Sequence, residues 1–209
     1  KKAKYEFFCF LHEDVLIETE NWGKLLIDEM KKDTSLGMIG VVGTKFRASY
    51  PAALTQSPFL HSYMRGRVLH KNRDEKYFQV LDFDKGENSS ALEEVLCLDG
   101  VFLFSKREVF SVCSFDQKLL QHFHAYDIDI SLQVFSAGYK LAITRKLDLY
   151  HFSTGNYGKE NTRANRLIAK KWWRKLPMVS RDVDIPCYKK KLLNVQNSFY
   201  FLFSAIKNK

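Results

Sequence analysis

Apolar runs in the first half of the chain alternate between strand-like and helix-like spacing, with short polar clusters between them. Residues 5–11 form an aromatic-rich run of strand length that ends abruptly at the polar triplet 12–14. Apolar residues then recur at helical spacing over residues 22–30, with Asn21 as a candidate N-cap, and residues 38–42 are typical of a buried strand. This order predicts a βαβ unit, in which two parallel strands pair through a right-handed crossover.

The rest of the pattern predicts a mixture of strands and helices. Residues 44–92 favour loops and a short antiparallel pair formed by "RGRVLH" and "KYFQVLDF". A strong apolar strand, a helix and two short strands follow, and the end of the chain is helical, cationic and interrupted by prolines. These elements cover residues 95–104, 126–137, 140–144, 148–151 and 159–206. Together they predict an α/β fold with a helical C-terminal tail.

Positive charge is concentrated at the C-terminal end. The net charge is +9, but residues 151–209 carry 13 Lys or Arg against three Asp or Glu, whereas residues 1–150 carry 20 against 21. This distribution indicates a basic appendage on a near-neutral domain. No apolar run is long enough to span a membrane, and no signal peptide is expected. The four cysteines lie far apart without a C-x-x-C pair, which favours buried free thiols in a reducing cytoplasm.

Polar residues stand where the predicted strands end. In open α/β sheets, ligands gather outside the carboxyl ends of the strands, so these residues could converge on one crevice. Carboxylates with an imidazole suit Mg2+ or Mn2+. Each cluster alone also has an ordinary structural explanation: acids near a helix N-terminus, a glycine turn, a helix cap, or a hydrogen-bonded core histidine. The clusters are His12-Glu13-Asp14, Asp99-Gly100, Asp127 with Asp129, and His151.

Four motifs, in this order, resemble those of the family-2 nucleotide-sugar glycosyltransferases with a GT-A-type fold, within the bacterial branch whose metal motif is "FLHxD". The motifs are "CFLHEDV", "LDGVFLFSKREVF", "FHAYDIDISLQVFSAGYKLAI" and "LYHFSTGN", and the resemblance covers residues 5–156. It implies a Rossmann-like mixed sheet flanked by helices. It also implies a metal-dependent sugar transfer from a nucleotide-diphosphate sugar, such as a UDP-sugar.

The resemblance assigns roles on the donor side of the site. Asp14 and His151 would bind Mn2+ or Mg2+ on the sugar diphosphate. His12, Glu13, Asp99 and Gly100 would contact the donor, and whether His12 is itself a metal ligand stays open. A divalent cation would neutralise the charge that develops on the nucleoside diphosphate as it leaves.

The resemblance also assigns the acceptor side. Asp127 would be the general base that takes the proton from the acceptor hydroxyl, with His124 and Asp129 beside the acceptor. A single base is sufficient for inversion by direct displacement. Tyr126 stands where many relatives have Glu, and Gln133 stands where an Arg is often found.

These assignments predict a catalytic domain over residues 1–158 and a basic helical extension over residues 159–209. The family places further βα units, which hold the nucleotide base, before the metal motif, and we expect that part to be absent from this sequence. The acceptor would be a hydroxyl of a glycan or a lipid-linked sugar, in a setting such as bacterial envelope polysaccharide synthesis in the cytoplasm. Two alternatives stay open: a non-catalytic or truncated relative that binds carbohydrate or a partner, and a metal-dependent hydrolase.

Basic residues flank aromatic ones in the tail. Lys170, Lys171 and Arg174 surround Trp172-Trp173, and residues 189–191 are lysines that precede the apolar stretch 192–206. This composition suits peripheral contact of residues 170–206 with an anionic membrane at its inner face. The alternative is that the aromatic residues pack on the domain and the cations form a solvated face. No nucleic-acid partner is expected, because no recognition module is visible.

Overall fold

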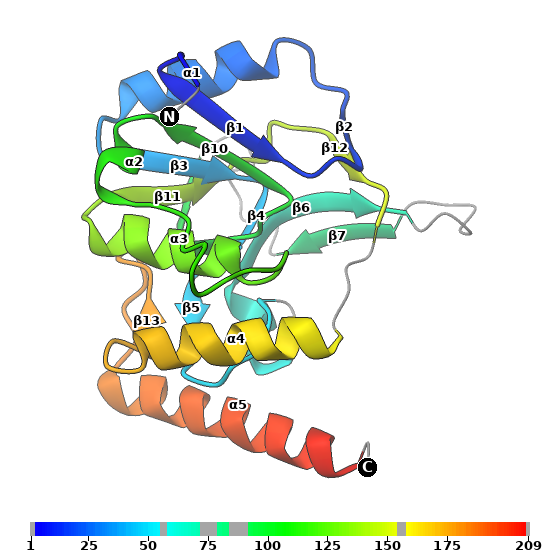
Figure 1. Ribbon diagram of the computed structural model, residues 1–209, viewed down its shortest axis with the longest axis vertical. Coiled ribbons are helices and arrows are strands. Elements are labelled where there is room, and N and C mark those ends of the chain that lie inside the picture. The colour runs from blue at the N-terminus through cyan, green and yellow to red at the C-terminus, as the bar shows by residue number, and fades with distance from the viewer. Residues whose placement is uncertain (1–2, 55–57, 72–78, 84–91, 154–157, 208–209) are drawn as a thin grey trace.

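The computed structural model describes residues 3–54, 58–71, 79–83, 92–153 and 158–207, with side chains described to residue 200. Two curled mixed sheets lie at the centre, with α1 (Trp22–Lys32) on one side and two long C-terminal helices on the other (Figure 1). The prediction of an α/β fold with a mixed sheet flanked by helices is confirmed. Residues 72–78, residue 86 and residues 154–156 of "LYHFSTGN" lie outside the described residues.

The first sheet has the strand order β1-β10-β3-β11-β8. Its strands are β1 (Phe7–Leu11), β10 (Phe102–Lys106), β3 (Leu36–Gly40), β11 (Lys140–Ile143) and β8 (Glu93–Val95). The prediction that β1 and β3 pair as parallel neighbours is wrong, because β10 lies between them and pairs antiparallel with both. The parallel partner of β3 is β11.

The second sheet has the order β2-β12-β6-β4-β9, with β7 paired to β6. Its strands are β2 (Val15–Ile17), β12 (Leu149–His151), β6 (Met64–His70), β4 (Val42–Thr44), β9 (Cys97–Leu98) and β7 (Gln79–Phe83). The antiparallel pairing of β6 with β7 is the predicted excursion. A further short pair joins β5 (Phe46–Arg47) to β13 (Met178–Val179).

Helices cover the sheets and share their cores. The helix α3 (Tyr126–Ser136) packs Ile130 and Val134 against Met38 and Leu103 of the first sheet, beside the short α2 (Val109–Val112). The helix α1 begins after Asn21, which has a left-handed backbone and makes no side-chain capping hydrogen bond.

The cationic helix α4 (Lys159–Trp172) is part of the main core. Its residues Ala164, Ile168 and Trp172 belong to the same buried cluster as Ile39 of β3 and Leu26 of α1. The boundary at residue 158 stays a prediction; α4 itself is packed into the main core.

The last helix, α5 (Cys187–Lys207), packs against the 3-10 helix η1 (Pro58–Tyr63) at the edge of the molecule (Figure 1). None of the described helices is both long and apolar enough to cross a bilayer. All four cysteines are free thiols; Cys97 and Cys113 are buried as expected, whereas Cys9 and Cys187 are exposed.

Candidate functional site

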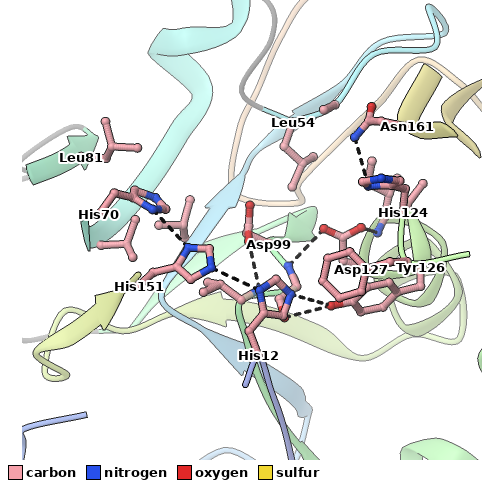
Figure 2. Close-up of a pocket in the computed structure, with 18 of the residues that line it drawn as sticks. His12, Leu54, His70, Leu81, Asp99, His124, Tyr126, Asp127, His151 and Asn161 are labelled. Atoms are coloured by element: carbon pink, nitrogen blue, oxygen red, sulfur yellow. Dashed lines mark hydrogen bonds between the residues drawn. The ribbon is translucent and has the colours of Figure 1, made fainter. Parts of the chain in front are cut away.

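A cavity of about 250 Å3 lies where several strands end (Figure 2). His12 immediately follows β1, and His70 and His151 are the last residues of β6 and β12. The strands β6 and β12 pair in parallel with His151 opposite His70. This register explains why two histidines that are far apart in the sequence meet at one edge of the sheet.

The opposite wall of the cavity comes from the turn after β9 and from the start of α3. Asp99 and Gly100 form the turn, Asp127 is the second residue of α3, and His124 lies two residues before the helix. The structure therefore brings most of the predicted residues into one cavity, with His70 and His151 on one side and Asp127 and His124 on the other (Figure 2). Asp14 contacts His151 but does not line the cavity.

His12, Asp14 and His151 form a compact cluster, in which the atoms that could bind a metal lie within 4.8 Å of one another. Nε2 of His151 lies 3.3 Å from Oδ1 of Asp14 and 3.4 Å from Nδ1 of His12. His151 is buried, and burial lowers its pKa although the carboxylate of Asp14 acts in the opposite direction. The ring is therefore neutral at pH 7, which is the form that binds metals.

The hydroxyl of Tyr126 determines where His12 carries its hydrogen. This hydroxyl donates to the carbonyl oxygen of Gly100 at 3.1 Å, so it accepts from Nε2 of His12 at 3.0 Å. The neutral His12 ring therefore has its hydrogen on Nε2, and the lone pair of Nδ1 faces His151. A histidine that binds a metal through one nitrogen usually donates from the other, and His12 is held in that state.

His70 plays a comparable part behind His151. Nδ1 of His70 lies 2.6 Å from the carbonyl oxygen of Ser153, which can only accept, so this nitrogen carries a hydrogen. Nδ1 of His151, 3.1 Å away, faces that hydrogen with a lone pair, which leaves the hydrogen of neutral His151 on Nε2 beside Asp14. A cation bound through Nε2 of His151 would place the hydrogen on Nδ1, and His70 could accept it only by moving its own hydrogen off Nδ1 and losing the bond to Ser153.

The cluster fits a divalent cation. Two imidazole nitrogens and one carboxylate make a mixed donor set that Mn2+ accepts readily, whereas Mg2+ strongly prefers oxygen ligands. Asp14 keeps 38% of its side chain exposed, so the cluster is open on one side to a further ligand. The donor set therefore favours Mn2+ over Mg2+ among the two predicted ions.

Asp127 is the carboxylate on the acceptor side of the cavity. Its Oδ2 accepts from the backbone N–H of Gly100 at 3.1 Å, and its Oδ1 accepts from that of Ile128 at 2.9 Å. Burial and, second, the negative charge of Asp99 raise the pKa of Asp127 to about 7. A carboxylate with this pKa can take up and release a proton near neutral pH.

Gly100 is required where Tyr126 and Asp127 approach the turn. A Cβ atom at this position would lie 2.4 Å from the hydroxyl oxygen of Tyr126 and 3.2 Å from Cβ of Asp127. Any side chain would therefore displace the hydroxyl that orients His12. The glycine links the two walls of the cavity because its carbonyl holds Tyr126 and its N–H holds Asp127.

The remainder of the cavity is mostly apolar. Leu54, Val68 and Leu81 are among its lining residues. His124 contacts Asn161 of α4, with Nδ1 of His124 and Nδ2 of Asn161 3.5 Å apart (Figure 2). Phe123 stands at the cavity with 64% of its surface exposed, and its ring centroid lies 4.9 Å from that of His12.

Two of the predicted site residues are placed elsewhere. Glu13 is exposed and does not line the cavity. Asp129 is buried on the far side of α3, where its carboxylate accepts from Nε1 of Trp172 and pairs with Nζ of Lys171, both at 2.8 Å. This contact joins α3 to α4, so the position of Asp129 beside the acceptor is not supported by its geometry.

Three residues of the site were not predicted. His70 ends a strand that the sequence predicts, so the rule that selected His151 could have selected it as well. Tyr126 was noted only as a departure from the family pattern. Asn161 lies in the cationic tail, where nothing in the sequence indicated that α4 returns to the cavity.

Comparisons with known proteins agree with the motifs. No curated protein matches the chain. Among solved structures, the chain is similar to the crystal structure of A197 from STIV, with 17% identity and a TM-score of 0.38 over 71% of this chain and 59% of that one. The chain thus spans about three fifths of that protein's length. A family model described as "Glycosyltransferase like family" matches residues 1–171, so the chain belongs to this glycosyltransferase-like family.

Proposed function

We propose that this protein transfers a sugar from a nucleotide-diphosphate sugar to a hydroxyl group of a glycan or lipid-linked acceptor, with inversion at the sugar. A glycosyltransferase-type function follows from the family. The observation that carries the finer proposal is that both histidines of a His-Asp-His cluster and a carboxylate with a pKa near 7 line one cavity.

The donor half of the proposal rests on the histidine cluster. His12, Asp14 and His151 would hold Mn2+, and Asp99 and Gly100 would border the donor sugar. When bound, the cation supplies positive charge that stabilises the diphosphate leaving group. His12 is oriented for this role by Tyr126, which makes His12 a proposed ligand as well as a donor contact.

The acceptor half rests on Asp127. Its carboxylate would accept the proton of the acceptor hydroxyl as the oxygen attacks the sugar carbon. Apolar residues such as Leu54 and Leu81 line the same cavity and suit the C–H face of a sugar ring. No second carboxylate on this side is needed, because direct displacement requires one base only.

Binding and turnover measured on the same variants test the proposal. Mn2+ and a UDP-sugar should bind to the wild-type protein in calorimetry, and transfer to a glycan acceptor should release UDP. Asp127→Asn should reduce turnover by about 100-fold or more while leaving Mn2+ and donor affinity unchanged. Asp28→Asn, an exposed carboxylate on α1, is the matched control and should behave as wild type.

The alternatives give different results. Full turnover by Asp127→Asn would show that another group is the base. Binding of a free glycan without any binding of Mn2+ or UDP-sugar would favour the non-catalytic carbohydrate-binding alternative. Release of free sugar at the same rate with and without acceptor would favour a hydrolase.

A further inference from the structure

The helix α5 exposes an apolar stripe along its length. Tyr188, Leu192, Val195 and Phe199 are 74%, 52%, 48% and 55% exposed. Their spacing of four, three and four residues places them on one face of the helix. The same spacing continues in the sequence at positions 202 and 206.

The opposite face of α5 holds the helix on the domain through polar and apolar contacts. Oδ1 of Asn194 accepts from the backbone N–H of Ser49 at 2.7 Å, and Asn197 is only 1% exposed, although its Oδ1 has no hydrogen-bond partner among the described residues. Leu193 packs against the small cluster around Phe46, and the ring of Tyr200 lies 5.8 Å from that of Phe59 in η1. The helix therefore buries Asn197 and exposes aliphatic and aromatic side chains, which is the reverse of an ordinary surface helix.

Cations border the exposed stripe, and acids are absent from this part of the sequence. Lys189 and Lys191 are exposed and follow Tyr188 by one and three positions, so the helix geometry places them on either side of the stripe. From residue 187 to residue 209 the sequence contains no Asp or Glu. A surface that covers this stripe would therefore bind more tightly if it carried negative charge.

We propose that α5 is an in-plane anchor that binds an anionic phospholipid surface. The apolar stripe would enter the boundary between headgroups and acyl chains, and the flanking lysines would contact the lipid phosphates. A second copy of the chain is a poorer occupant, because it would bring lysines against lysines with no acid to pair with them. The inference does not depend on the proposed enzymatic function.

The position of α5 connects this surface to the cavity. The helix packs against η1, and η1 leads directly into β6, the strand that ends at His70. A protein attached through α5 would therefore keep its cavity at a fixed distance from the lipid surface. This arrangement fits an acceptor that is carried on a lipid, if the proposed transfer is correct.

Vesicle co-sedimentation of the full chain tests the anchor. The protein should bind vesicles of phosphatidylcholine mixed with phosphatidylglycerol, and it should bind vesicles of phosphatidylcholine alone much more weakly. Leu192→Glu and Val195→Glu should each lower the partition coefficient by about tenfold or more, because each places a charge where an apolar side chain would be buried. Lys189→Gln with Lys191→Gln should lower it by about 30-fold, which corresponds to about 1 kcal/mol per cation.

Matched variants elsewhere on the surface distinguish a specific role of the α5 stripe from a general effect of changing surface charge or hydrophobicity. Val112→Glu changes an equally exposed valine on α2, and Lys24→Gln with Lys31→Gln removes the same net charge from α1; both should bind vesicles as wild type. Circular dichroism should show that the α5 variants are folded. The proposal is overturned if anionic vesicles do not bind the protein, if the α1 and α5 lysine variants behave alike, or if α5 instead forms a dimer that Leu192→Glu dissociates without lipid.

Discussion

The buried carboxylate of Asp127 makes a specific prediction about pH. Burial and the charge of Asp99 raise its pKa to about 7, and a general base must be ionised to act. Turnover should therefore rise as the pH increases, with a midpoint near 7, and level off above it. A pH profile of kcat/KM at saturating Mn2+ measures this midpoint.

Asp99→Asn provides the internal test of that explanation. Removing the negative charge of Asp99 makes ionisation of Asp127 easier, so the midpoint should move to lower pH even if the maximal rate also falls. A midpoint that stays in place would mean that the titrating group is not Asp127. The pH shift separates this electrostatic effect from a simple loss of donor binding.

His70 is predicted to act on metal affinity through His151. When Nε2 of His151 binds a cation, its Nδ1 carries a hydrogen, and His70 can accept this hydrogen only by moving its own hydrogen off Nδ1 and giving up the bond to the carbonyl of Ser153. His70→Gln, whose amide oxygen can accept without that loss, should therefore bind Mn2+ more tightly than wild type in calorimetry, whereas His70→Phe, which leaves Nδ1 of His151 without an acceptor, should bind Mn2+ more weakly than His70→Gln. His122→Phe, on an exposed loop, is the control and should bind as wild type; equal Mn2+ affinities of the two His70 variants would contradict the prediction.

At the scale of elements, the strand β6, which ends at His70 in the cavity, contains a glycine with a positive φ. Gly66 has φ of +103°, and a Cβ atom there would lie 1.9 Å from the backbone oxygen of Val41. Backbone atoms cannot yield as a flexible side chain can, so Gly66→Ala should destabilise the protein by about 3 kcal/mol or more and misplace His70.

Gly138 offers a matched comparison for that prediction. Its φ is +98°, but a Cβ atom there would meet nothing within 4 Å. Gly138→Ala should therefore cost only about 1 kcal/mol, the strain of the backbone alone. Urea unfolding of both variants measures the difference, and equal losses would show that the contact with Val41 is not important.

The positions of the helices and strands were largely predictable from the local pattern of apolar residues, whereas the pairing of the strands was not. The strands β1 and β3 and the helix α1 follow from apolar spacing. The strand β10 lies between β1 and β3 because segments far apart in the chain pair with one another. The local spacing of apolar residues does not indicate such long-range pairing.

The same limit applies to the site. His12, Asp99, Asp127 and His151 could be selected because polar residues ended apolar strands or began a helix. Asp129 could not be distinguished from Asp127 by pattern, since both lie in the first turn of α3. Asp129 lies away from the cavity because it accepts a hydrogen bond from Trp172 of α4, a contact that the sequence does not indicate.

At the scale of the whole molecule, the domain should not fold without α4. Ile168 and Trp172 are buried in the main core, and Asp129 would lose two of its charge and hydrogen-bond partners. Burial of each large side chain is worth about 2–3 kcal/mol, against a typical total stability of about 5–15 kcal/mol. A chain of residues 1–158 should therefore lack a cooperative thermal transition in circular dichroism.

A chain of residues 1–186 is the comparison for that experiment. It keeps α4 and removes α5, which contacts the small cluster around Phe46 and Leu60 through Leu193. This chain should unfold cooperatively, with a lower transition temperature than the full chain. Cooperative unfolding of residues 1–158 would instead support the predicted boundary between a catalytic domain and a separate extension.

The way α5 is attached has a consequence for how membrane association would be controlled. Because the face of α5 with Leu193 and Asn194 already holds the helix on the domain, its apolar stripe is displayed without any prior opening or refolding. Attachment would then need no trigger, and the bound fraction would follow only the amount of anionic lipid and the ionic strength. The same permanent display would make the purified protein prone to self-association at high salt and high concentration, where the repulsion between lysines is screened, unless lipid or detergent is supplied.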